Sequence, residues 1–238
     1  TGVQTCALPI SLFGALPYWF SGTCDTFCDS YFESMSGLTT TGASIFNDIE
    51  ALPKGILFWR SMTQWLGGMG IVVFFVAILP TIGVGGHKLF SAEAPDLTTD
   101  KIKPRIAQTA KILWVIYLSL TAILIPFLWF GGMEFFDAVC HSFTTVSTGG
   151  FSTKNQSIAA FDSLFIEIVI MVFAFIAGCN FILYYQLVTG KFKKVLANSE
   201  IRFFVSLMLC AICLITLALF FFDSTSYNGG VKDHKYDS

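Results

Sequence analysis

Two short strings of threonine, serine and glycine carry the residue types that could replace the water around a small cation. They are TTTGAS at residues 39–44 and STGGFS at residues 147–152. Stripping water from a cation is costly, so a protein path for ions must offer oxygen ligands, which rings of backbone carbonyls supply. Glycine adopts the unusual backbone angles that such a ring requires without steric cost. Either string alone would be typical of an ordinary turn.

The two strings belong to a longer internal repeat, which makes the pattern much more specific. DSYFESMSGLTTTGAS at 29–44 aligns without a gap with DAVCHSFTTVSTGGFS at 137–152, so that Thr40 falls on Thr148 and Gly42 on Gly150. Shortly afterwards WLGGMGI aligns with FIAGCNF. Self-similarity of this kind indicates a repeated structural unit.

Long apolar stretches surround both strings. A membrane-spanning helix needs about 20 apolar residues, and we predict four, with a fifth stretch at 7–20 too short and resembling the outer end of a truncated span. Between them lie two short semi-polar segments, each followed by one of the strings. These are predicted to be re-entrant pore helices, because irregular backbone survives at membrane depth only inside protein or beside a water-filled path. The spans are 56–79, 112–133, 163–190 and 203–222, and the short segments are 26–38 and 134–146.

The predicted fold is therefore an all-α integral membrane protein with tandem helix–pore loop–helix repeats. It has about four to five spanning helices and two short re-entrant helices. We assign residues 11–80 to a first repeat truncated at its start, 105–190 to a second, and 198–238 to the truncated start of a third. Residues 1–10 lack the basic region of a signal peptide, and we set them aside as a leader foreign to the protein.

Composition excludes several classes of protein. Apolar residues make up 54% of the 238 residues and charged residues 13%, whereas soluble domains carry about 25% charged residues. A net charge of −2 without a long basic run predicts no nucleic-acid partner. The histidines His87, His141 and His234 are far apart in sequence, and no catalytic set converges. We predict no enzyme, and no cofactor other than a transported ion.

Basic residues gather in two of the loops between spans. Residues 81–104 and 189–202, with their flanks, contain most of the lysines and arginines, while acidic residues dominate the other connections. By the positive-inside rule both loops are predicted to be cytoplasmic. The two short segments and their strings then enter the membrane from the outer face.

The strings SGLTTTGAS, TVSTGGFST, FWRSMTQWLGGMGI and FIAGCNF together resemble the bacterial Trk-H type subunit of the Trk/Ktr/HKT superfamily, from about residue 16 to residue 222. Members carry four such repeats around one pore, so the resemblance implies potassium transport through a filter of backbone carbonyls. Both first filter glycines are present, which in this superfamily favours K⁺ over Na⁺. The filter positions carried over, where K⁺ would bind, are Thr40, Thr41, Gly42, Ala43, Thr148, Gly149, Gly150 and Phe151.

The resemblance also implies the surroundings of the chain. They are the lipid bilayer of the cytoplasmic (inner) membrane, a homodimer of the full-length protein, and a cytosolic nucleotide-binding regulatory subunit of the Trk-A type. Two filter loops cannot ring an ion, so this chain alone is not expected to conduct. The alternatives are a sodium-permeable or sodium-coupled transporter of the same superfamily, a pore of separate chains, a membrane-embedded enzyme and a non-conducting scaffold. Tandem, divergent repeats disfavour separate chains.

One charge falls inside a predicted span. Arg60 lies a short way into the stretch 56–79, and a charge at membrane depth is costly and normally finds a partner. Glu33 on the first short segment is our candidate, since the pair would hold that segment against the span and fix the filter loop. The alternative is that Arg60 extends to the outer interface.

Overall fold

The computed structural model describes residues 2–70, 102–179, 184 and 198–228, and all regular secondary structure in these ranges is helical. The chain divides into two compact units, Thr1–Tyr185 and Gln186–Ser238. The all-α architecture expected from the sequence agrees with the helices of the described residues.

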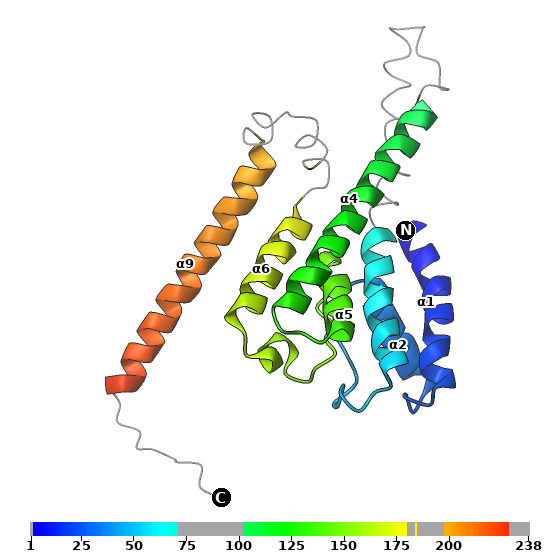
Figure 1. Ribbon diagram of the computed structural model, residues 1–238, viewed down its shortest axis with the longest axis horizontal. Helices are drawn as coiled ribbons and strands as arrows, with labels where there is room; N and C mark the ends of the chain where they lie inside the picture. Colours follow the sequence, from blue (N-terminus) through cyan, green and yellow to red (C-terminus); the bar gives the residue numbers. More distant parts are fainter. Residues whose placement is uncertain (1, 71–101, 180–183, 185–197, 229–238) are drawn as a thin grey trace, which may run out of the picture. The chain divides into compact units, whose positions relative to one another are not determined.

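The first part of unit 1 contains α1 (Gly2–Phe20), α2 (Phe27–Leu38) and a helical segment at 54–70. The helix α2 begins at a threonine cap, since the Oγ1 of Thr26 accepts from the backbone N–H of Asp29 at 3.1 Å. Such a cap satisfies an amide that the first helical turn leaves unpaired. The helices α1 and α2 pack together (Figure 1). Residues 2–10, set aside as a leader, are helical and continue directly into α1.

The second part of unit 1 repeats this order. It contains α4 (Ile102–Phe130), α5 (Phe135–Val146), a short 3₁₀ helix η2 (Ser157–Phe161) and α6 (Leu164–Gly178). The long helices α4 and α6 both pack against the short α5 (Figure 1). The expected span at 163–190 is wrong as a single helix, because α6 ends at Gly178 and Cys179 is extended (ψ 152°).

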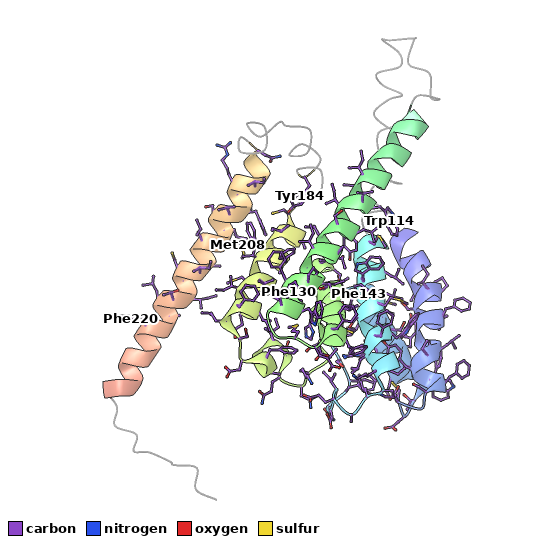
Figure 2. All side chains as sticks on the ribbon, viewed as in Figure 1. Trp114, Phe130, Phe143, Tyr184, Met208 and Phe220 are labelled. Atoms are coloured by element: carbon purple, nitrogen blue, oxygen red, sulfur yellow. The ribbon has the colours of Figure 1, made fainter. Side chains whose placement is uncertain are left out.

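A buried apolar cluster holds α4, α5 and α6 together. Leu124 and Leu128 of α4 are fully buried against Ala138 of α5 and Ile166 of α6. Phe143, labelled on α5 in Figure 2, has its ring centroid 5.3 Å from that of Trp65 in the segment 54–70. The two parts of unit 1 therefore share one packed interior, which fixes α5 relative to the segment 54–70.

Unit 2 contains the single described helix α9 (Ser199–Asn228). Within the described residues, two stretches are long and apolar enough to cross a membrane, Ile112–Phe130 of α4 and Ile201–Ala218 of α9. The end of the expected span 56–79, and most of the loops expected at 81–104 and 189–202, lie outside the described residues.

Candidate functional site

The two threonine–glycine strings adopt the same backbone conformation. Thr40 and Thr148 both have φ of 54°, and Gly42 and Gly150 have φ of 78° and 83°. Glycine reaches this left-handed region freely, whereas a β-branched threonine there is strained by about 1–3 kcal/mol. The same strain at equivalent positions of two divergent copies indicates that the conformation is required at this site.

Hydrogen bonds at the ends of the short helices also match between the copies. In each copy the second and third residues of the string donate their backbone N–H groups to carbonyls of the last helical turn. These bonds are Thr40 to Gly37 (3.0 Å) and Thr41 to Ser36 (2.9 Å) in the first copy, and Thr148 to Thr145 (3.0 Å) and Gly149 to Thr144 (2.8 Å) in the second. The repeat seen in the sequence is thus a repeat of three-dimensional geometry.

The two loops touch each other. A side chain added at Gly42 would collide with the carbonyl oxygen of Gly149. At the outer end expected from the loop charges, the next loop segments also join, because Ile49 N donates to the Oδ1 of Asn155 (2.7 Å) and the Nδ2 of Asn155 donates to Asp48 (2.9 Å). This amide hydrogen bond holds the pKa of Asp48 below its usual range. Both loops therefore lie on the same side of unit 1 (Figure 1).

Carbonyl oxygens, the ligands expected for a cation, differ in how they are used. Ala43 O accepts from the Oγ of Ser36 (2.5 Å), and Gly149 O accepts from the Nε2 of Gln64 (2.9 Å). Among the described residues, no hydrogen bond reaches the carbonyl oxygens of the other six filter positions, which are Thr40, Thr41, Gly42, Thr148, Gly150 and Phe151. These six are the oxygens that remain available to a cation.

Phe151 occupies the last expected filter position of the second copy. Its side chain is 3% exposed and lies under the guanidinium of Arg60, whose Cζ is 4.2 Å from the ring centroid. The ring therefore packs inside the protein, and only the backbone of Phe151 could face a cation.

Arg60 lies at the centre of a buried polar network. Its Nε donates to the Oε1 of Glu33 at 2.8 Å, and the two side chains are 1% and 0% exposed. The Nη2 of Arg60 donates to Ser44 Oγ (3.0 Å) and its Nη1 donates to the carbonyl of Ser152 (3.2 Å). Arg60 thus contacts both loops, and the alternative in which it extends to the interface does not occur in this structure.

His141 takes the place of Glu33 in the second copy. The Oγ of Ser44 donates to Glu33 (2.9 Å), and the equivalent Ser152 Oγ lies 3.0 Å from the Nε2 of His141. Nδ1 of this histidine lies 2.8 Å from the carbonyl of Asp137. Both copies therefore hold the last serine of the string against the short helix, one through a carboxylate and the other through an imidazole.

Sequence reasoning missed Gln64, Ser36, Ser44 and Ser152 as parts of the site. Gln64 is fully buried, although it lies in a stretch predicted to span the membrane. A polar amide among apolar residues, one helical turn after Arg60, was the available signal, because such a group in a membrane needs a partner inside the protein. Nothing in the sequence showed which partner it would find.

Comparisons with known proteins agree with this geometry. A family model described as "TrkH: Cation transport protein" matches residues 1–229. The Trk system potassium uptake protein TrkH of Escherichia coli strain K12 is 49% identical over 211 residues, covering 87% of this chain and 44% of that protein. TrkG of the same strain is 40% identical over 202 residues, covering 84% of this chain and 42% of that protein.

A solved structure gives the same result. The crystal structure of the potassium transporter TrkH from Vibrio parahaemolyticus matches with a TM-score of 0.77 and 39% sequence identity, covering 92% of this chain and 45% of that chain. The chain spans less than half the length of the relatives it matches. It belongs to the TrkH family of cation transport proteins.

Proposed function

We propose that this chain supplies two carbonyl-bearing loops of a path for K⁺ across the cytoplasmic membrane. The observation that carries the proposal is the contact between two loops of matching backbone conformation, at Gly42 and Gly149. The K⁺ ligands proposed are carbonyl oxygens of the eight filter positions, above all the six that accept no hydrogen bond among the described residues. The names of the relatives, which are potassium uptake proteins, support the choice of ion.

The short helices add a favourable field to this path. The helix α2 ends at Leu38 and α5 ends at Val146, each immediately before its loop. The C-terminal end of a helix carries a partial negative charge of about half an elementary charge. Two such ends beside the loops favour a cation over an anion there. Two loops cannot ring an ion, so we propose that further loops of the same pattern complete the path in the full-length protein.

We assign Arg60 and Glu33 a structural part in this function. The pair ties α2 to the helical segment 54–70, and the two remaining guanidinium contacts tie that segment to the last serine of each string. Removing either charge is therefore expected to loosen both loops. This gives the intramembrane charge a role that does not require contact with the ion.

The membrane setting follows from the same proposal. Residues 81–104 and 189–202 would face the cytoplasm, and the acidic connections that include Asp48 would face outward. The partners proposed are the lipid bilayer, a second full-length copy and a cytosolic nucleotide-binding subunit. The repeat boundaries 11–80, 105–190 and 198–238 belong to the same proposal.

Potassium-limited growth of a transport-deficient bacterial host carrying the complete gene tests the function. Growth at low K⁺, with tracer uptake of K⁺ much faster than that of Na⁺, is the expected result. Faster Na⁺ uptake would favour the sodium-transporting alternative of the same family. If neither cation enters faster than in the empty host, the proposed function is wrong.

A further inference from the structure

A single buried amide holds the backbone on both sides of Gly150. The Nε2 of Gln64 donates to the carbonyl of Gly149 at 2.9 Å, and the N–H of Phe151 donates to the Oε1 of Gln64 at 3.1 Å. Gln64 is 0% exposed. Both halves of its amide are thus committed to the second filter loop, across a sequence separation of 85 to 87 residues.

These two bonds fix the orientation of both peptide planes that meet at Gly150. That residue has φ of 83° and, lacking a side chain, resists rotation of its neighbouring peptide planes very little. In the first loop the equivalent planes flank Gly42. Over the residues that the structure describes, no hydrogen bond reaches the carbonyl of Thr41 and none is donated by the N–H of Ala43. Gln64 therefore holds the peptide planes on both sides of Gly150, whereas among the described residues no hydrogen bond holds the equivalent groups on both sides of Gly42.

The amide has no counterpart in the second repeat. When Gly68 is aligned with Gly178, Gln64 falls on Ala174, which has no side-chain polar group. Gln64 acts on the loop of the following repeat, because its helical segment belongs to the first repeat and both of its bonds reach the second loop. This arrangement makes the two loops chemically unequal.

The held carbonyl also has little room to move. The oxygen of Gly149 lies against the backbone of Gly42 and accepts from Gln64. A sodium ion is smaller than a potassium ion, so its ligands must approach the axis more closely to replace the same water. A loop whose peptide planes are held by hydrogen bonds resists that contraction, because supporting hydrogen bonds keep the ligands of a site in place.

We propose that Gln64 is a positioning residue that sets the K⁺ selectivity of the second filter loop. The inference rests on the proposed function, since it names what tunes the same site. Gln64 touches the filter backbone and not the ion, so its contribution is to selectivity rather than to ligand number.

The test uses the complete protein in vesicles, with K⁺ and Na⁺ tracer fluxes measured for wild type, Gln64→Met and Gln64→Glu. Methionine keeps the length of the side chain but removes both bonds. Glutamate in its protonated form can donate to Gly149 and accept from Phe151, and in its ionised form it can only accept. Gln156→Met is the matched control, because Gln156 is exposed and makes no capping bond through its side chain.

We expect Gln64→Met to lower the K⁺:Na⁺ flux ratio by about tenfold or more, the size of effect that loss of a buried hydrogen bond produces. Gln64→Glu is expected to recover the ratio as pH is lowered, because protonation restores the missing donor. An unchanged ratio in Gln64→Met, with normal yield and melting temperature, would overturn the inference. If Gln64→Met does not fold, a pH-independent ratio in Gln64→Glu overturns it. If the wild type takes up neither cation, the proposed function itself is overturned. That outcome is distinguishable from an unchanged flux ratio, which overturns only the inference about Gln64.

Discussion

Breaking the Arg60–Glu33 pair gives the most direct measure of what holds the filter loops. The changes are Arg60→Gln, Glu33→Gln and the double variant. Removing one partner of a buried ion pair costs about 3–5 kcal/mol, because it leaves an uncompensated charge. Arg60→Gln is expected to fall at the upper end of that range, since it also removes the bonds to Ser44 Oγ and Ser152 O. Glu33→Gln is expected at the lower end of the range, because the guanidinium of Arg60 keeps those two hydrogen bonds and its contact with the ring of Phe151.

The double variant leaves neither charge buried alone. Its cost should therefore be close to that of Arg60→Gln by itself, which implies a coupling free energy of about 2–4 kcal/mol between the two side chains. Denaturant unfolding of the complete protein in detergent measures the free energies of unfolding, and K⁺ uptake is followed in parallel. If the two single costs add to within about 0.5 kcal/mol in the double variant, the side chains do not interact and the reasoning is refuted.

Three further predictions concern the loops and their orientation. Gly42→Ala should reduce K⁺ uptake strongly, since a side chain at φ 78° costs about 1–2 kcal/mol and would strike Gly149 O, whereas Gly70→Ala, which meets no described atom within 4 Å, should have little effect on uptake. The pKa of Asp48 is lowered by its hydrogen bond from Asn155. This bond between the outer loops is therefore fully present above the ordinary pKa of aspartate, about 4. It is lost as the pH falls through the lowered pKa of Asp48. Protease cleavage of those loops should rise on acidification, and Asn155→Ala should remove that dependence. A membrane-impermeant maleimide should label the exposed Cys28 in intact cells but not a Cys28→Ser variant, and no labelling would contradict the orientation.

The sequence was sufficient to recognise the repeat and to expect both of its loops on the same side of the chain. The threonine and glycine strings align because the same hydrogen bonds close the same helix end in both copies, so similarity of residues followed from similarity of geometry. Glu33 could also be named as a candidate partner of Arg60, because a charge at membrane depth normally finds a partner, although extension of Arg60 to the interface was the alternative. In these respects local pattern and membrane physics were enough.

Other features could not be read from the sequence. Left-handed Thr40 and Thr148 contradict the preference of β-branched residues, and only the surrounding fold imposes that conformation. Gln64 binds residues 85 to 87 positions away, which no local pattern reveals. The end of α6 at Gly178 was missed because the apolar run continues beyond it, and hydropathy does not register where a helical backbone conformation ends.

The position of Arg60 and Gln64 ahead of the second loop has a consequence for synthesis. Ribosomes extend the chain from its N-terminus, so the helical segment 54–70 emerges before the loop at 147–152 that it contacts. The helical segment 54–70 can thus be in place before the loop at 147–152 folds against it. Exchanging the order of the two halves in a circularly permuted gene would remove this advantage while leaving every native contact possible.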